Sequence, residues 1–204
     1  MKPIEIFEKA QIHSYGIGQF NISTDEQIIA AVEAAKELNS PIIIGTSEGE
    51  REFIGIEQVV ALIKTWKEKT GLPIILHADH CKTFESVKEV VDAGYDSVHF
   101  DGSKLPFEEN VRITKRVIEY AKSINPNIMV EGEIGYLPGG SDIHGEVTIK
   151  PSDLTQPEEA KKFVQETEVD SLAIAIGNIH GMKENCDDSH LYLDRLEDIK
   201  RAVP

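Results

Sequence analysis

The stretch LPIILHADHCK, residues 72–82, is an apolar run that passes without a break into His77, Asp79, His80 and Cys81. Polar side chains of this kind are costly to remove from water unless they are paired or bound to a ligand. A polar loop after a strand would be the simplest explanation of one such cluster. That explanation weakens if other strands of the chain end in the same way.

Apolar runs and amphipathic, helix-like stretches alternate along the whole chain. The expected strands span residues 16–22, 41–47, 73–79, 96–102, 127–135 and 171–181. The expected helices span residues 25–38, 56–69, 84–93, 107–123, 157–166 and 191–202. Strand followed by helix, repeated, predicts a parallel sheet covered by helices, because nearly all-apolar strands suit burial on both faces. We expect a single domain over residues 1–204.

Two architectures fit this pattern, an open doubly wound sheet and a (β/α)8 TIM barrel. No Gly-rich dinucleotide fingerprint follows the first strand, which disfavours the open sheet. Polar residues recur at the strand ends, which favours the barrel: Asn21, Ser47, Asp79, His80, Asp101, Glu131, Glu133, Asn178 and His180. In a barrel these ends meet at one rim, where barrel enzymes have their active sites.

The composition excludes several classes of function. Apolar residues make up 40% and charged residues 28% of the chain, an ordinary globular composition. A net charge of -15 argues against a nucleic-acid partner but leaves a small phosphorylated substrate open. No run approaches the roughly 20 apolar residues that span a bilayer, and the N-terminus has no signal-peptide core. With only Cys81 and Cys186, far apart, a disulfide framework is not expected. We therefore expect a cytoplasmic protein without a membrane partner.

His80, His180 and Glu133 would give the rim a mixed nitrogen and oxygen donor set suited to Zn²⁺ or a similar divalent ion. Asp79, beside His80, could act as a general acid/base or as a partner that orients a ligand histidine. The same alternatives apply to Asp101 and Glu131, for which an orienting role is favoured. His77 is interpreted as a hydrogen-bonded core histidine, Cys81 as a buried, inert thiol, and His99 has no assigned role.

A Gly-rich segment, GYLPGGSDIHG, follows the fifth expected strand at residues 135–145. Loops of this length in compact domains are often lids over active sites, and the alternative is a surface loop without a role. Asp142 or His144 could be brought over the rim if this lid closes.

With these residues in hand, the sequence resembles the class II, metal-dependent fructose-bisphosphate aldolases and related ketose-bisphosphate enzymes such as tagatose-bisphosphate aldolase. The resemblance covers nearly the whole chain in the family's order. The stretches that carry it are GIGQFNI, PIILHADHC, YDSVHFDGSKLPFEEN, VEGEIG and VDSLAIAIGNIHG. It implies a (β/α)8 barrel that cleaves a ketose 1,6-bisphosphate reversibly. Fructose 1,6-bisphosphate would then give dihydroxyacetone phosphate and glyceraldehyde 3-phosphate.

The resemblance also implies roles for single residues. His80 and His180 match two zinc ligands, and Glu133 matches a glutamate that holds the metal in an alternative position. Asp79 matches the acid/base that handles the proton of the substrate's C4 hydroxyl. In the lid, Asp142 would have to supply the proton transfer that a glutamate provides in the family.

Further matches concern the substrate and the assembly. Asn21, Ser47 and Asp101 match positions near the substrate. Gly181 lies in a segment that helps to hold phosphate and a monovalent cation, Na⁺ or K⁺. The family also implies a homodimer or homotetramer.

Family members continue into a seventh strand ending in a His-Gly-Gly motif, which donates a third zinc histidine, and an eighth whose loop binds phosphate. Neither is found here, so we expect only the first six βα units of a barrel in a C-terminally incomplete chain. Six units would leave two exposed sheet edges. The alternatives are a non-catalytic truncated homologue that binds metal or sugar phosphate and, less favoured, a barrel hydrolase.

Overall fold

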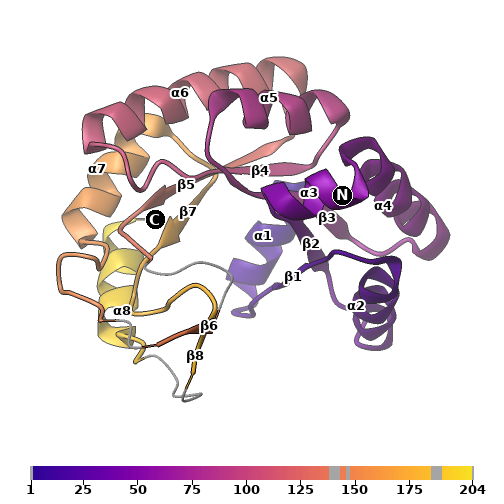
Figure 1. Ribbon diagram of the computed structural model, residues 1–204, viewed down its shortest axis with the longest axis horizontal. Helices are drawn as coiled ribbons and strands as arrows, with labels where there is room; N and C mark the ends of the chain where they lie inside the picture. Colours follow the sequence, from indigo (N-terminus) through magenta and orange to yellow (C-terminus); the bar gives the residue numbers. More distant parts are fainter. Residues whose placement is uncertain (1, 138–142, 146–147, 185–189, 204) are drawn as a thin grey trace. The chain divides into compact units, whose positions relative to one another are not determined.

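The computed structural model describes residues 2–137, 143–145, 148–184 and 190–203 (Figure 1). Its strands are β1 (Gly18–Asn21), β2 (Ile42–Thr46), β3 (Ile74–Cys81), β4 (Ser97–Phe100), β5 (Met129–Ile134), β6 (Ile143–His144), β7 (Ser171–Ile174) and β8 (Met182–Lys183). Its helices are α1 (Pro3–Ile12), α2 (Asp25–Glu37), α3 (Glu48–Ile54), α4 (Ile56–Thr70), α5 (Phe84–Ala93), α6 (Phe107–Ile124), α7 (Pro157–Thr167) and α8 (Leu193–Ala202).

The main sheet of the described residues has the strand order β1-β2-β3-β4-β5-β7. Strands β1 to β4 pair in parallel. At least one helix separates each strand of this sheet from the next strand of the sheet, which is the connection that parallel strands need. The predicted succession of six βα units is therefore confirmed.

The chain divides into two compact units. Unit 1 contains Met1–Asp101 and Arg116–Glu131, and unit 2 contains Gly102–Lys115 and Gly132–Pro204. Unit 1 thus contains β1 to β4 and the first half of β5. The second half of β5 and all of β7 belong to unit 2.

The core of unit 1 includes contacts between the N-terminal helix and the sheet. Ile6 of α1 packs with Ile43 of β2 and Ile75 of β3, all nearly inaccessible to solvent. Every residue of β2 is buried, as its apolar sequence predicts. Figure 1 shows α2, α4 and α5 along the outer side of these strands. Burial of both strand faces fixes the register, and the register fixes which side chains reach the strand ends.

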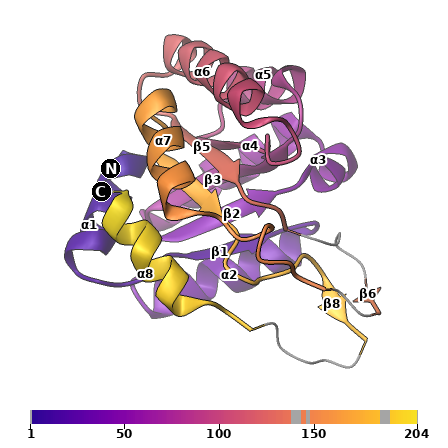
Figure 2. The ribbon, with the colours of Figure 1, turned by 90° about the vertical axis from the view of Figure 1, so that its left-hand side faces the viewer.

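In unit 2, helices α7 and α8 lie side by side (Figure 2). Their buried residues Ala160, Phe163 and Ile199 form one cluster with Val111 of α6 and Ile134 of β5. This cluster packs against β5 and β7. The predicted site residue Glu133 lies on β5, and His180 and Gly181 follow β7.

Four elements were not predicted from the sequence: α1, α3 and the two-residue strands β6 and β8. The expected strand at residues 171–181 also ends early, at Ile174. At the next residue, the backbone N–H of Ala175 donates to a side chain, Oγ1 of Thr155, at 2.9 Å. Gly177 then takes a left-handed conformation with φ of 106°. As a result, His180 lies in a loop rather than directly at a strand end.

Within the part of the chain that the structure describes, no helix is both long and apolar enough to cross a membrane.

Candidate functional site

Strand β3 ends in a β-bulge that contains His80. The pairing with β4 runs from His77 opposite Ser97 to Ala78 opposite Val98, and then shifts so that Cys81 stands opposite Phe100. β3 therefore has one extra residue there, and His80 adopts a φ of 45°. A non-glycine residue rarely takes this left-handed conformation, and such strain concentrates at functional sites. The bulge determines where the His80 ring points.

Arg51 of α3 holds the two residues that flank His80. Its guanidinium group is buried and donates to the carbonyl oxygens of Thr46 and, at 3.2 Å, Asp79. It also donates to the Cys81 sulfur at 3.5 Å. Burying a cation away from water is costly, and hydrogen bonds to these three acceptors offset part of that cost. Arg51 thereby ties β2 to both sides of the bulge.

The Asp79 carboxylate has polar neighbours on β1, β3 and β4. Asn21 Nδ2 donates to its Oδ2 at 2.7 Å, while His80 Nε2 and His99 Nδ1 each lie 3.8 Å from Oδ1. Burial alone would raise the pKa of Asp79. Hydrogen bonds with His99 and Asn21, together with the electrostatic effect of His80 and His77, outweigh burial and hold this pKa well below its usual range. Asp79 is therefore ionised at neutral pH and able to accept a proton.

Asp101 orients the His80 ring. Its Oδ2 lies 3.2 Å from His80 Nδ1. Because an ionised carboxylate only accepts hydrogen bonds, Nδ1 carries the proton, and Nε2 is then the unprotonated nitrogen of the neutral ring. The Asp101 backbone N–H donates to the carbonyl oxygen of Cys81 at 3.0 Å, which fixes Asp101 beside the bulge. In metal sites, the ring nitrogen of a ligand histidine that does not bind the metal commonly donates its N–H to a carboxylate in this way.

Gly45 of β2 leaves room for the Asn21 side chain. A Cβ atom at position 45 would lie 2.1 Å from Asn21 Oδ1, well inside contact distance. Gly45 and Asn21 stand opposite each other in the paired strands. The glycine is thus needed for the Asn21 side chain to lie where it meets Asp79.

Three more polar residues, His77, His99 and Glu131, lie on the neighbouring strands β3, β4 and β5 of unit 1. His99 Nδ1 of β4 lies 3.6 Å from Oε1 of Glu131 on β5. His77 Nδ1 lies 2.9 Å from Ser97 Oγ, which confirms the prediction of a hydrogen-bonded core histidine. Burial lowers the pKa of His77, so its ring is neutral at physiological pH.

Ser47 directly precedes helix α3. Its hydroxyl accepts from the Glu50 backbone N–H at 3.4 Å, and its own N–H donates to Glu50 Oε2 at 2.6 Å. This is a helix N-cap. The structure therefore gives Ser47 contacts within α3 rather than with Asp79 or His80.

The remaining predicted site residues belong to unit 2, apart from Asp142, which lies outside the described residues. Glu133 of β5 is buried, and its carbonyl oxygen accepts from Asn110 Nδ2 at 2.8 Å. His180 is partly exposed, and Gly181 has a left-handed φ of 75°. Strand β6, at the end of the predicted lid, pairs in parallel with β8, which follows Gly181 directly. The backbone of Ile143–His144 is therefore paired next to the His180–Gly181 segment.

The donor atoms at the end of β3 suit a transition metal. One atom each from Asp79, His80 and His99 lies within 4.8 Å of the others, and His77, His99 and Glu131 form a second such group. Imidazole nitrogens mixed with carboxylate oxygens are typical ligands of Zn²⁺ and related ions. The end of β3 therefore offers donor chemistry that suits such an ion, and the predicted ligand set of His80, His180 and Glu133 stays a prediction.

Cys81 has the properties of an inert thiol. It is fully buried, and this burial raises its pKa to about 11 despite the nearby Arg51 cation. A thiol of this kind is protonated at neutral pH and is a poor nucleophile.

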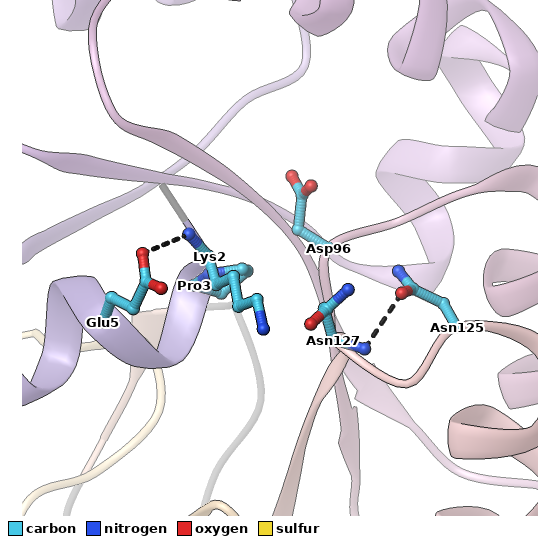
Figure 3. Close-up of a pocket in the computed structure, with 6 residues that line it drawn as sticks. All are labelled: Lys2, Pro3, Glu5, Asp96, Asn125 and Asn127. Carbon is cyan, nitrogen blue, oxygen red and sulfur yellow. Dashed lines mark hydrogen bonds between the residues drawn. The ribbon is translucent and has the colours of Figure 1, made fainter.

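A separate cavity of about 450 Å³ lies at the opposite, amino-terminal ends of the strands, and its lining residues are drawn in Figure 3. It is lined by Lys2, Pro3, Glu5, Asp96, Asn125 and Asn127. The Lys2 backbone N–H donates to Glu5 Oε2 at 2.9 Å, and the Asn127 N–H donates to Asn125 Oδ1 at 3.0 Å. This end of a barrel usually serves stability rather than catalysis.

Sequence reasoning missed two residues of the site, His99 and Arg51. His99 stands two residues before Asp101, so strand alternation puts both on the same face. This alternation could have placed His99 at the site from the sequence. No sequence pattern indicated Arg51, because its burial depends on contacts with the bulged end of β3.

Comparisons with known proteins agree on one family. A family model described as class-II fructose-bisphosphate aldolase matches residues 2–204. The fructose-bisphosphate aldolase of Helicobacter pylori strain 26695 is 41% identical over 204 residues, which cover 100% of this chain and 66% of the relative. That of Giardia intestinalis is 40% identical over 198 residues, 96% of this chain and 59% of the relative.

The crystal structure of the YdjI aldolase from Escherichia coli K12 is similar, with a TM-score of 0.80 and 28% identity. The match covers 100% of this chain and 68% of that one. The chain spans 59–66% of the length of the two curated relatives above. The fold is that of a partial TIM barrel, as the sequence predicts.

Proposed function

The chain belongs to the class II fructose-bisphosphate aldolase family, and from this membership we propose that it acts in the metal-dependent, reversible cleavage of a ketose 1,6-bisphosphate. Fructose 1,6-bisphosphate is the proposed substrate, and dihydroxyacetone phosphate and glyceraldehyde 3-phosphate are the proposed products. The reaction would make the protein a lyase of carbohydrate metabolism, with a role in glycolysis.

One observation carries this proposal: the bulged end of β3 presents a base and a metal-ligand candidate side by side. Asp79 is ionised, and His80 is oriented through its Nδ1 by Asp101. Cleavage between C3 and C4 begins with removal of the C4 hydroxyl proton, and Asp79 accepts that proton. Asn21 keeps the carboxylate in place by binding Oδ2, so that Oδ1 faces the histidines.

We propose Zn²⁺ as the cofactor, with His80, His180 and Glu133 among its ligands. When bound, a divalent ion supplies Lewis-acid stabilisation of the negative charge that develops on the three-carbon fragment. Support comes from the donor chemistry at the β3 end and from the Asp101–His80 contact, the arrangement that holds ligand histidines in metal sites. Glu131 would support this set through His99, which it approaches to 3.6 Å.

Binding of the substrate is assigned to several further residues. We propose that Asn21, Ser47 and Asp101 lie near the sugar phosphate, and that Gly181 belongs to a segment that holds phosphate and a monovalent cation, Na⁺ or K⁺. The left-handed φ of Gly181 supports the last assignment, because such backbone turns expose N–H groups to anions. Asp142 is the proposed proton-transfer residue of the lid.

The proposed setting is the cytoplasm, and the proposed assembly is a homodimer or homotetramer. Both follow from family membership. Sedimentation equilibrium of the purified chain would test the assembly, because a monomer at micromolar concentration contradicts it.

Aldol cleavage combined with metal analysis tests the function. The zinc-loaded protein is assayed with fructose and tagatose 1,6-bisphosphates, with dihydroxyacetone phosphate as the measured product. Asp79→Asn should lower turnover at least about 100-fold while zinc content stays the same. Asp92→Asn, on the exposed face of α5, is the matched control and should leave turnover unchanged. Zinc binding without cleavage of either sugar would favour a binding homologue instead, and loss of zinc from Asp79→Asn would make Asp79 a metal ligand.

A further inference from the structure

His77, His99 and Glu131 form a group of possible metal ligands that is distinct from the three proposed zinc ligands, His80, His180 and Glu133. They come from the consecutive strands β3, β4 and β5, all within unit 1. One donor atom from each lies within 4.8 Å of the others. The two histidine rings are stacked, with centroids 6.3 Å apart and planes inclined by 22°. Three donors are thus held on adjacent, paired strands, which are rigid supports.

The state of His77 is the main observation. The residue is 4% exposed, and its Nδ1 lies 2.9 Å from Ser97 Oγ. Its second nitrogen, Nε2, is buried and has no hydrogen-bond partner in the described structure. A buried polar atom in this state has lost its hydration without compensation, which is uncommon in native proteins. When Nδ1–H donates to the serine hydroxyl, Nε2 is unprotonated and can donate its lone pair to a metal ion. Ligand histidines in metal sites have the same arrangement, with the other ring nitrogen hydrogen-bonded.

The surroundings of His99 supply the charge that a cation requires. Its Nδ1 lies 3.6 Å from Glu131 Oε1 and 3.8 Å from Asp79 Oδ1. The Glu131 side chain is 24% exposed, whereas that of His99 is 3% exposed. An ion would therefore enter past Glu131 and meet the two histidines in the interior.

From these contacts we propose that His77, His99 and Glu131 bind a divalent transition-metal ion. Two imidazoles and one carboxylate select Zn²⁺, Co²⁺ or Ni²⁺ over Mg²⁺ and Ca²⁺, which prefer oxygen ligands. The set shares no residue with His80, His180 and Glu133, so this site is additional to the proposed catalytic one. Three protein ligands leave a coordination position for water. The bound ion would also fix His99 beside Asp79.

Co²⁺ binding by the His80→Ala/His180→Ala double variant of the 204-residue chain separates the two sites. The double variant should still bind about one equivalent of Co²⁺, with a visible absorption band. Adding Glu131→Gln, which keeps the shape of the side chain, should weaken the affinity at least about tenfold. Adding His77→Gln should do the same. His13→Gln, at the exposed end of α1, is the matched control and should have no effect.

X-ray absorption at the zinc edge of the zinc-loaded double variant should show two imidazole ligands. Circular dichroism and the melting temperature establish that each variant is folded. The inference is overturned if the folded double variant binds no Co²⁺, or if its affinity is unchanged by both Glu131→Gln and His77→Gln. Because aldol cleavage is not the readout, this failure is distinct from failure of the proposed function.

Discussion

The side-chain amide of Asn21 donates a 2.7 Å hydrogen bond to Oδ2 of Asp79, although 58 positions separate the two residues in the sequence. Asn21 ends β1 and Asp79 lies near the end of β3, so the bond reaches across the intervening strand β2. A neutral donor that holds one carboxylate oxygen leaves the other to act on a substrate. The position and the charge of Asp79 therefore depend on a residue from the first strand.

Asn21→Ala should lower turnover about tenfold or more, because a hydrogen bond to a charged group contributes about 1.5–3 kcal/mol. The pKa of Asp79 should rise toward its ordinary value, as carbon-13 NMR of the labelled carboxyl would show. Zinc content should not change. Gln19→Ala, two residues earlier on β1, is the control. An unchanged Asp79 pKa in Asn21→Ala would contradict the role given to this bond.

Gly45→Ala should disturb the same contact indirectly. The added methyl group would lie 2.1 Å from Asn21 Oδ1 and would push the amide away from Asp79. We expect a loss of about 1–3 kcal/mol in the free energy of unfolding, measured with urea, and a loss of turnover similar to that of Asn21→Ala. Gly49→Ala in α3 meets nothing within 4 Å and should stabilise the protein slightly, because alanine favours helix. Equal effects of the two substitutions would refute the steric argument.

Arg51→Met should weaken zinc binding without removing any ligand. The loss of the guanidinium group leaves the carbonyl oxygens of Thr46 and Asp79 buried without this donor, at a cost of about 1–3 kcal/mol in stability. The bulge that positions His80 would then relax toward ordinary strand geometry. Isothermal titration with zinc measures the affinity. Arg112→Met removes an exposed arginine of α6 and should leave both quantities near wild type.

The Cys81 thiol should resist alkylation until the pH is strongly basic. Burial raises its pKa from about 9 in the unfolded chain to about 11 in the folded protein. Its contribution to stability is therefore complete below about pH 9 and is lost as the pH rises through 11. Iodoacetamide labelling of the Cys81 peptide, followed by mass spectrometry, should be slow at pH 8 in the native protein and fast in denaturant. Rapid native labelling at pH 8 would show that the thiol is accessible.

The sequence predicts the six βα units well, because buried parallel strands have nearly uninterrupted apolar sequences. It also predicts that Asn21, Asp79, His80 and Asp101 stand at strand ends, and the structure pairs them as Asn21 with Asp79 and His80 with Asp101. The extra residue at His80 was not predicted, since a bulge depends on pairing with β4 and leaves no pattern in β3 itself.

Two other features lay beyond the sequence pattern for different reasons. A single histidine in an apolar strand, such as His99, is by default a core residue, and only its neighbours on β3 and β5 suggest more. Arg51 belongs to a short helix that breaks the simple strand–helix alternation. Charged helix residues usually face solvent, so its burial follows from carbonyl groups at the ends of β2 and β3, which come together only in the folded protein.

Asp101→Asn tests whether the orientation of His80 controls the metal. The ionised carboxylate accepts the Nδ1 proton at 3.2 Å and leaves Nε2 to bind a cation. An asparagine amide can donate to Nδ1 instead, which would move the ring proton to Nε2 and block the ligand nitrogen. We expect zinc affinity to fall about 10–100-fold. Asp25→Asn, exposed at the start of α2, should have no such effect. If Asp101→Asn binds zinc as tightly as the wild type while turnover falls, Asp101 contacts the substrate and does not orient His80.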